Sequence, residues 1–374
     1  MTYIPYIAIK KQDAQRLINA LKNYNKISFF NKEYKIIEKE NTLYFPLKRD
    51  VEQKIKDDLK DRFNFQIIPL KGERDPSYKA RSLEEALRNK IPSKAYKLIP
   101  HSYDLVGTVA IVEFDRGTQV LNRKKIKKKV AEAIIEVNNN VKTVYEKRSK
   151  IGGTYRLRKL KFLTGLRGTI TIHKENHCKF KIDLNKVFFS PRLNFERKRI
   201  SSLNIKDNEC IADLFAGVGA FSVQLAKYKK VLIHAFDINP AAIKLLKENM
   251  QLNNLQGTII PHKMDVKALL NPKNPMSGSL QNKIDRIIMN LPEHSLNYLD
   301  VACHLSKLSG TLLHIYQFSA KPHSVQRSIE KLRNKLNALQ WMVHTIKNAK
   351  IVKSYSPQSN MIAIDALIKK STPS

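Results

Sequence analysis

Cysteine is scarce in this sequence of 374 residues, and the three present, Cys178, Cys210 and Cys303, stand far apart. They offer neither a disulfide framework nor a zinc-ligand spacing, so we expect a reducing compartment, the cytoplasm, and no bound metal. Apolar runs of about 18 residues, the length that spans a bilayer, are missing, and so is the apolar core of a signal peptide. These absences argue against a secreted disulfide scaffold and a membrane protein, and we expect a soluble one.

Acidic residues are few relative to basic ones. The chain has 33 Asp and Glu against 68 Lys and Arg, a formal net charge of +35 at pH 7. An excess of this size predicts a polyanionic partner, for which nucleic acid is the main candidate. A general enrichment in lysine would give the same total without forming a binding face, and the sequence leaves both interpretations open.

Hydrophobic content of 42% is typical of a folded protein, and the length suits two or three domains. Residues 1–72 alternate short strand and helix patterns, residues 80–185 form a second such unit, and residues 186–374 form a third. The polar stretch 70–79, LKGERDPSYK, contains Gly and Pro and is the expected linker. We therefore predict an α/β protein in which two smaller domains precede a larger one.

Strand and helix patterns alternate in the third unit, which predicts a doubly wound, Rossmann-type sheet whose strand order reverses beside its glycine turn. Strands are expected at 210–214, 231–236, 258–260, 284–289 and 310–316, helices at 219–227, 240–250, 294–307 and 322–338, an edge pair at 341–347 and 361–367, and a surface loop at 271–283. The middle unit should contain a helix at 123–137, a strand at 102–114 with a break at Gly107, and one mixed sheet from 141–144, 160–163, 169–173 and 178–182.

The stretch DLFAGVGAF, residues 213–221, follows a short apolar run and opens an apolar-periodic segment. This order is typical of a strand, a tight glycine turn and a helix N-terminus, where a ligand approaches bare backbone amides. The stretch lacks the third glycine of a dinucleotide fingerprint and the Lys-Ser/Thr pair of a P-loop, which favours a single-nucleoside cofactor. We expect Asp213 and Gly217 to face the charged tail of that cofactor.

A second apolar run ends in Asp237, about 20 residues after the glycine turn, where a Rossmann-type sheet places its ribose-binding carboxylate. A carboxylate can accept hydrogen bonds from both ribose hydroxyls. Asp265, in PHKMDV, would follow the third strand and either touch the base edge or form a strand-terminating turn. The sequence leaves both roles of Asp265 open.

The fourth strand ends in IIMNLPEHS, residues 287–295. Reactions in open α/β sheets take place at the carboxyl edge, where this stretch would lie. Asn290 offers one acceptor and two donors to a substrate base, and Pro292 fixes the loop backbone. The tripeptide NLP alone could be an ordinary turn, but its position predicts a site.

Four motifs in order, VFFSPRLNFERKRI, DLFAGVGAF, FDINP and MNLPEHS, resemble those of the archaeal and eukaryotic tRNA (guanine-37-N1)-methyltransferases. The resemblance extends over the chain and is strongest over 154–318. It implies a Rossmann-fold catalytic domain, S-adenosyl-L-methionine as the cofactor, and tRNA as the partner, contacted at the anticodon loop and the outer corner. The first unit would grip the outer corner with its lysines and with Tyr3, Tyr6 and Tyr24, residues that suit a solvated surface or a core equally well.

Methyl transfer to guanine N1 needs a base for the N1 proton and a cation for the charge that develops on O6. The resemblance implies Glu196 as the base and Arg156 as the cation, with Arg158 as a second candidate. Alternatively, Glu196 is a surface charge whose basic neighbours 197–199 lower its pKa, unless burial counters them. The resemblance also implies that Asn290 and Pro292 hold the guanine edge. The implied cofactor-binding residues are Phe188, Arg197, Asp213, Phe215, Gly217, Gly219, Asp237, Asn239, Asp265 and Asn290.

Other activities remain open alongside methylation of guanosine 37 by a monomer. A bifunctional member of the family would also methylate a tricyclic wyosine precursor at carbon, with His294 and Ser295 lining a more tolerant pocket. A related enzyme would transfer the aminocarboxypropyl group of the same cofactor, although an NLP motif together with Glu196 favours methyl transfer. A cofactor-free RNA-binding protein of this fold is the non-enzymatic alternative.

Overall fold

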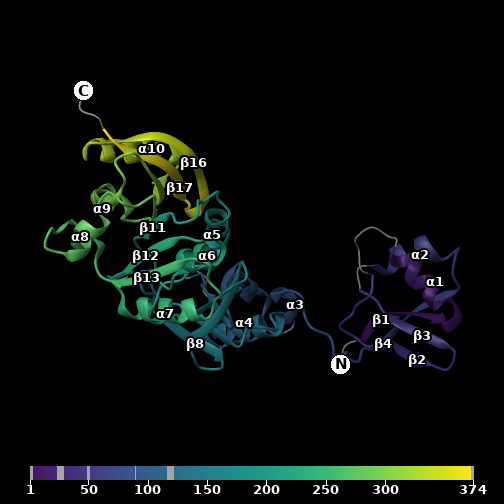
Figure 1. Cartoon of the computed structure of the whole chain (residues 1–374). Helices are drawn as coiled ribbons and strands as arrows, with labels where there is room; N and C mark the ends of the chain where they lie inside the picture. Colours follow the sequence, from purple (N-terminus) through teal and green to yellow (C-terminus); the bar gives the residue numbers. More distant parts are fainter. Residues whose placement is uncertain (1–2, 23–28, 49–50, 89, 116–121, 372–374) are drawn as a thin grey trace. The chain divides into compact units, whose positions relative to one another are not determined.

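A computed structural model describes residues 3–22, 29–48, 51–88, 90–115 and 122–371. The chain forms two compact units, Met1–Arg88 and Asn89–Ser374 (Figure 1), and each is described by itself. The predicted division at 72–80 and at 185–186 stays a prediction, because these two units do not test it. None of the helices in the described ranges is long and apolar enough to cross a membrane.

The first unit is a four-stranded sheet in the order β2-β3-β1-β4 with helices packed on it. Leu17 and Leu21 lie on the predicted apolar face of the first helix and are buried in the core. Tyr6 is also fully buried, and its hydroxyl donates to Lys35 O at 3.3 Å, so Tyr6 is a core residue. Tyr3 is 63% exposed, and Tyr24 lies outside the described residues. The elements are β1 (Tyr3–Lys10), α1 (Lys11–Lys22), β2 (Ile37–Lys39), β3 (Thr42–Pro46), α2 (Glu52–Leu59), β4 (Phe65–Lys71) and α3 (Leu83–Leu87).

The amino-terminal part of the second unit contains two sheets where one was predicted. The predicted strand at 102–114 is an antiparallel hairpin, because Gly107 takes a left-handed φ of 55° and reverses the chain. This hairpin extends into a sheet of order β5-β6-β7-β8, and β9 and β10 form a separate pair. The elements are η2 (Ser93–Leu98), β5 (Tyr103–Val106), β6 (Val109–Val112), α4 (Arg123–Val137), β7 (Thr143–Lys147), β8 (Leu160–Gly165), β9 (Ile170–Glu175) and β10 (Cys178–Asp183).

Two asparagine side chains satisfy the free edge of β10 in place of a further strand. Asn249 accepts from Lys181 N at 2.6 Å, and Asn253 accepts from Lys179 N at 2.9 Å. Their amide groups donate back to the carbonyl oxygens of the same two lysines. Asn249 also donates to Val218 O at 2.9 Å and thereby ties β10 to the glycine turn. The sequence did not reveal this separation, because the polar partners of β10 come from the end of a helix and the turn after it, about 70 residues further along the chain.

The remaining residues build the predicted doubly wound sheet. Its order is β13-β12-β11-β14-β15-β17-β16, with parallel pairing from β13 to β15 and antiparallel pairing beyond. The strand order reverses between β11 and β14, beside the glycine turn, as predicted. The elements are η3 (Pro191–Leu193), α5 (Asn194–Ser201), β11 (Cys210–Asp213), α6 (Ala220–Tyr228), β12 (Leu232–Asp237), α7 (Pro240–Gln251), β13 (Thr258–Lys263), η4 (Val266–Leu270), α8 (Pro275–Leu280), β14 (Arg286–Met289), η5 (Ser295–Tyr298), α9 (Leu299–Leu305), β15 (Thr311–Ala320), α10 (Ser324–Asn337), β16 (Trp341–Ser356) and β17 (Ser359–Lys370).

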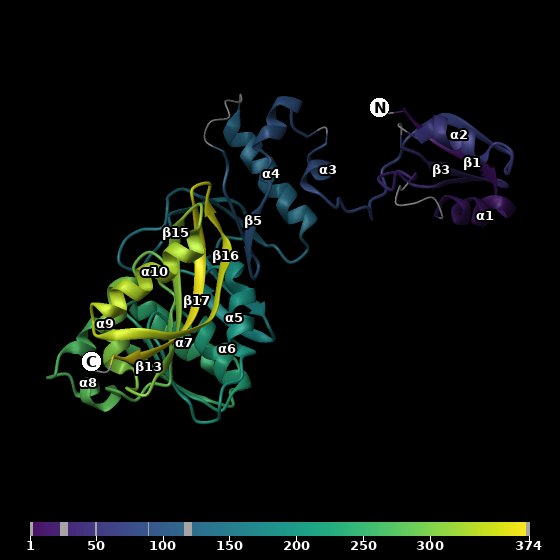
Figure 2. The same cartoon turned by 90° about the horizontal axis from the view of Figure 1, so that it is seen from above.

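Both faces of this sheet are covered by helices. Ile211 and Ile288 belong to the core under α5, α6 and α7, while their neighbours Ala212 and Ile287 belong to the core under α9 and α10. This alternation follows from the two-residue period of a strand. Figure 2 shows α9 and α10 on one side of β17, with α5 and α6 on the other. Burial on both faces explains why these strands are continuous apolar runs.

Two predicted segments of the sheet domain differ from the structure. Residues 271–283 were expected to be a loop but contain α8, which Asn274 caps by accepting from Met276 N at 3.0 Å and which begins at Pro275. This helix of six residues is too short for periodicity to reveal. The edge strands β16 and β17 are also much longer than the predicted runs 341–347 and 361–367. This is because β17 pairs with β15 as far as Ala320, and β16 in turn pairs with β17 along its length.

Candidate functional site

A pocket of about 470 Å³ opens at the carboxyl edge of the parallel strands. Its size suits a small organic ligand. Ten of the predicted site residues line it: Arg156, Phe188, Arg197, Phe215, Gly217, Asp237, Asn239, Asp265, Asn290 and Pro292. Glu196, Asp213 and Gly219 are not among its lining residues.

The glycine turn presents bare backbone to the pocket. Gly217 has φ of 57°, and a Cβ there would meet nothing within 4 Å, so the pocket is open in front of it. Gly219 has φ of 84° and caps α6, but a Cβ there would lie 2.2 Å from Leu246 Cδ1. Gly217 therefore gives a ligand access to the backbone, and Gly219 permits close packing of α6 against α7.

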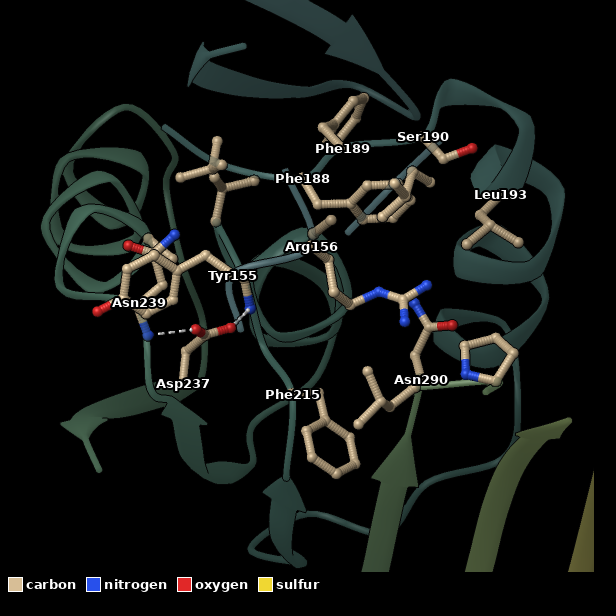
Figure 3. Close-up of a pocket in the computed structure, with 18 of the residues that line it drawn as sticks. Tyr155, Arg156, Phe188, Phe189, Ser190, Leu193, Phe215, Asp237, Asn239 and Asn290 are labelled. Carbon is tan, nitrogen blue, oxygen red and sulfur yellow. Dashed lines mark hydrogen bonds between the residues drawn. The ribbon is translucent and has the colours of Figure 1, made fainter. Parts of the chain in front are cut away.

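Asp237 ends β12 with both carboxylate oxygens held by backbone amides. Oδ2 accepts from Gly217 N at 2.8 Å, and Oδ1 accepts from Asn239 N at 2.8 Å (Figure 3). Each oxygen keeps a further lone pair for a ligand hydroxyl. Burial raises the pKa of Asp237, and the two amide bonds act against that rise. The geometry suits a vicinal diol such as a ribose.

Asp213 lies at the end of β11 and is buried, with Ser222 Oγ donating to its Oδ2 at 2.7 Å. Burial raises the pKa of Asp213 to about 7, and the nearby carboxylate of Asp237 adds to the rise. Since Asp213 supports the turn from outside the pocket lining, the predicted contact with a cofactor tail stays a prediction.

Asn239 and Asp265 line the pocket and also cap the helices that follow them. Asn239 accepts from Ala241 N at 2.9 Å and donates to Lys186 O at 2.7 Å. Asp265 accepts from Lys267 N at 2.9 Å. The strand-terminating turn considered for Asp265 is therefore present, and the same residue faces the pocket.

The loop after β14 is held from behind by a serine. Leu291 N donates to Ser295 Oγ at 3.2 Å, and this hydroxyl lies 2.8 Å from Leu291 O. Asn290 Oδ1 is buried and has no hydrogen-bond partner among the described residues, so it has an acceptor position available for a ligand. The prediction that His294 and Ser295 line the pocket is wrong, because the chain turns away into η5 and Ser295 is buried under the loop.

Arg156 comes from the connection between β7 and β8 and extends into the pocket (Figure 3). Its backbone has a left-handed φ of 54°. The guanidinium donates from NH1 to Glu293 Oε2 at 2.6 Å, and its Cζ lies 5.7 Å from the centre of the Phe188 ring. Arg158 also lines the pocket, and its buried Nε has no partner within the described ranges. The pair Arg156–Glu293 thus links two loops at the rim of the pocket.

Glu196, on α5, is buried in a cluster of polar groups. Its Oε1 lies 2.7 Å from Lys350 Nζ, and its Oε2 accepts from Tyr316 OH at 3.1 Å and from Arg199 NH2 at 2.9 Å. Burial raises the pKa of Glu196, but hydrogen bonds from Arg199 and Lys350 outweigh burial and hold the pKa below its ordinary value. Glu196 is therefore a paired, ionised carboxylate and not the exposed surface charge that was the alternative.

The cations next to Glu196 in sequence have separate roles. Arg197 points the other way and pairs with Glu175, with NH2 donating to Oε2 at 2.6 Å, and its Cζ lies 5.1 Å from the Phe189 ring centre. Arg199 continues from Glu196 to Asp365 on β17, whose Oδ1 lies 2.7 Å from His314 Nδ1. Burial raises the pKa of Asp365, but hydrogen bonds from His314 and Arg199 outweigh burial and hold this pKa at about 2.

Four partners of the predicted residues were not found from the sequence: Glu175, Glu293, Tyr316 and Lys350. Glu293 stands within the motif MNLPEHS and could have been considered, while the other three carry no local signal. Taken together, the residues present fit a nucleoside cofactor. Gly217 leaves a bare backbone, Asp237 offers diol acceptors, and Asn290 has an unused buried acceptor.

Comparisons with known proteins agree with this geometry. The model of the TRM5/TYW2 methyltransferase domain family matches residues 171–344, and that of the TYW2 N-terminal domain matches residues 83–168. The tRNA (guanine(37)-N(1))-methyltransferase Trm5b of Pyrococcus abyssi is 35% identical to this chain over 89% of it and 90% of the relative.

Solved structures of similar proteins cover the chain as well. The complex of aTrm5 with tRNALeu is 32% identical and covers 97% of this chain and 99% of its own, with a TM-score of 0.72. The structure of Methanocaldococcus jannaschii TYW2 in complex with AdoMet is 26% identical, with a TM-score of 0.53, and covers 72% of this chain and 100% of its own.

Proposed function

This chain belongs to the TRM5/TYW2 family of tRNA (guanine(37)-N(1))-methyltransferases, and on that premise we propose that it methylates N1 of guanosine 37 in tRNA with Glu196 as general base. The observation that supports this assignment is a single pocket lined by Gly217 and Asp237 on one side and by Arg156 and Asn290 on the other. One set suits a nucleoside cofactor, and the other suits the polar edge of a purine.

S-adenosyl-L-methionine bound in this pocket would supply an electrophilic methyl group on its sulfonium. Asp237 accepts hydrogen bonds from the two ribose hydroxyls, using the lone pairs that Gly217 N and Asn239 N leave free. Gly217 leaves room for the charged tail, and Phe215 and Phe188 provide apolar walls that exclude water. Asp265 accepts from the base edge.

Glu196 takes the N1 proton of the guanine. Glu196 is not among the residues that line the pocket, and its Oε1 is held by Lys350, a side chain that is 42% exposed. Displacement of Lys350 would free Oε1 to accept the N1–H of a bound guanine. Tyr316 and Arg199 keep Oε2 fixed during that displacement. A carboxylate of low pKa is ionised at neutral pH but is a weak base. Methyl transfer makes the guanine progressively more acidic. The N1 proton must therefore leave during the transfer, when even a weak base can accept it.

Arg156 stabilises the charge that develops on guanine O6. Glu293 occupies NH1, and the remaining donors of the guanidinium stay available for the oxygen. The anchoring by Glu293 and the Phe188 ring limits the freedom that Arg156 would lose when substrate binds. Asn290, with its unused acceptor, and Pro292 hold the amino edge of the same base.

We further propose that the first unit binds the outer corner of the tRNA and that the protein acts as a monomer. The net charge of +35 supports a polyanionic partner. Tyr6 does not take part in this contact, because it is buried in the core of that unit.

Incubation of the full chain with unmodified tRNA and cofactor labelled in its methyl group, followed by digestion to nucleosides, tests the function. We expect labelled 1-methylguanosine from tRNA with G37 and none when that nucleotide is replaced. Cofactor labelled in its carboxyl group is the matched control, because only aminocarboxypropyl transfer would carry that label into RNA. Equal methyl labelling without G37, or label from the carboxyl group alone, would contradict the proposal.

The same assay on tRNA carrying the tricyclic wyosine precursor tests for a second methylation at carbon. Calorimetry with cofactor alone separates an enzyme from a cofactor-free RNA-binding protein, since the latter gives no heat of binding.

A further inference from the structure

Beside the proposed methylation site, the antiparallel edge of the sheet forms a wall. Strand β15 pairs with β14 only as far as Ile315, and it then continues to Ala320 with β17 as its strand partner. On this extension Phe318 stacks with Tyr355 of β16, with ring centres 3.9 Å apart and planes inclined by 26°. Tyr355 is 51% exposed, so one aromatic face is rigidly supported and the other is open.

Lys353, two residues before Tyr355 on β16, lines the same pocket and lies near two further cations that line it, Arg192 and Lys147. Asp104 accepts from Arg192 Nε at 2.6 Å and lies 2.9 Å from Lys147 Nζ, and Lys147 is also 4.0 Å from the exposed Glu113. Lys353 has no ion pair within the described ranges of the chain. Burial lowers the pKa of Lys353, and Arg192 adds to the lowering, while the carboxylate of Asp104 acts against it. Lys353 therefore faces more cations than anions in this part of the pocket, which suits a phosphate.

The aromatic pair and the cations belong to the pocket that would hold the target base. Phe318, Tyr355, Arg192 and Lys353 line it together with Asn290. Phe318 N donates to Pro292 O at 3.1 Å, which fixes the aromatic wall directly against the loop proposed to hold the guanine. The wall thus lies next to the place proposed for the guanosine, within reach of a neighbouring nucleotide.

We propose that Tyr355, supported by Phe318 and flanked by Arg192 and Lys353, is a subsite for the RNA nucleotide adjacent to the methylated guanosine. The base of that nucleotide stacks on the open face of Tyr355, and its phosphate lies between the two cations. A base next to a flipped-out nucleotide loses one stacking neighbour. An aromatic side chain can take the place of that neighbour whatever the identity of the base. This inference rests on the proposed function, because it takes the guanosine in the pocket as given.

Two tRNAs test the subsite, each with 2-aminopurine at the nucleotide on one side of the target guanosine. We expect one of the two to lose fluorescence on binding the wild-type protein through stacking. Tyr355→Ala should abolish that change and weaken tRNA binding about tenfold, whereas Tyr355→Phe should retain both. Lys353→Ala should reduce the slope of log affinity against log salt by about one. Ile351→Ala, 51% exposed on the same strand, is the matched control and should change nothing.

Cofactor affinity, measured by calorimetry, shows that each variant is folded. A Tyr355→Ala protein that binds cofactor and retains wild-type fluorescence and tRNA affinity would overturn the subsite, as would an unchanged signal from both tRNAs with wild-type protein. Methyl transfer by the wild-type preparation is assayed in parallel. Its absence would refute the proposed function, whereas active wild type with an indifferent Tyr355 would refute the subsite alone.

Discussion

On one side of the pocket, Asp237, Asn239 and Asp265 each accept a hydrogen bond from the backbone N–H two residues further along the chain. On the other side, Arg156 pairs with Glu293, and Glu196, which lies outside the pocket lining, pairs with Lys350. We refer to the first three residues, which we propose hold the cofactor, as the cofactor half, and to Arg156 and Glu196, which we propose act on the guanine, as the target half.

The difference lies in the distance along the sequence over which each half is organised. The contacts of the cofactor half are turns and helix caps, which form wherever a strand ends in Asp or Asn and a helix or turn follows. The ion pairs of the target half join elements that are far apart in the sequence. Glu196 of α5 pairs with Lys350 of β16, and Arg156 of the β7–β8 connection pairs with Glu293 of the loop after β14. The caps of the cofactor half are therefore a property of local segments, although Gly217 N and Lys186 O reach Asp237 and Asn239 from further along the chain. The ion pairs of the target half exist only in the assembled domain.

The sharpest separation of the two halves should come from Glu196→Gln. We expect the single-turnover rate of methyl transfer to fall by roughly 100-fold or more, because a positioned base is lost. Cofactor affinity should be unchanged, since Glu196 contacts Arg199, Tyr316 and Lys350, none of which we assign to the cofactor. Glu248→Gln, which removes a half-buried charge paired with Lys181 away from the pocket lining, is the control. A parallel loss of cofactor affinity would mean that Glu196 supports the cofactor half and is not the base.

Opposite pH dependences should distinguish two buried carboxylates, Asp365 behind the target half and Asp213 behind the cofactor half. The pKa of Asp365 is about 2 in the folded state and 3.8 ordinarily. Its contribution to the free energy of unfolding is therefore complete above about pH 4 and is lost as pH falls toward 2. The pKa of Asp213 is raised from 3.8 to about 7, so the folded state keeps a proton that the unfolded state releases. Stability should therefore decline as pH rises from 4 to 7.

Thermal midpoints across this pH range, measured without ligand, test the two signs. Asp365→Asn should lower the free energy of unfolding at pH 7 by about 3 kcal/mol, because Arg199 loses one of its two carboxylate partners and keeps only Glu196. Asp213→Asn should flatten the decline between pH 4 and 7. If Asp365→Asn stabilised the protein, or if Asp213→Asn left the slope of stability against pH unchanged, the fold would not shift the pKa values of the two carboxylates in opposite directions.

The smallest of the three effects is expected from Asp237→Ala. Cofactor binding should weaken by about 10- to 100-fold, since hydrogen bonds to a charged group contribute about 1.5–3 kcal/mol. Binding of tRNA alone should remain at the wild-type level. Calorimetry and filter binding measure the two affinities, with the exposed Asp207→Ala as control. Equal loss of both affinities would show that the halves are coupled and would remove the distinction between them.

The sequence predicted the elements of the sheet domain well, since its signals are local. Asp237 and Gly217 could be assigned because a strand, a glycine turn and a helix follow one another within a few residues. Prediction failed where the deciding contact was distant. The pair β9–β10 was merged with its neighbours because Asn249, near the end of α7, and Asn253, just after it, satisfy β10 from far along the chain. The capped helix α8 was missed because it is too short to show a period.

In the candidate site, too, the sequence predicted the local contacts and missed the distant ones. The sequence by itself determined which residues end the strands, the φ values that only glycine adopts easily, and the motifs whose order predicts a methyltransferase. Only the tertiary structure decided which cation meets which carboxylate: Arg197 leaves Glu196 for Glu175, and Lys350 arrives from an edge strand. The physical reason is that backbone turns and caps depend on the nearest residues. In a chain with 68 basic and 33 acidic side chains, an ion pair depends on where the whole fold brings them together.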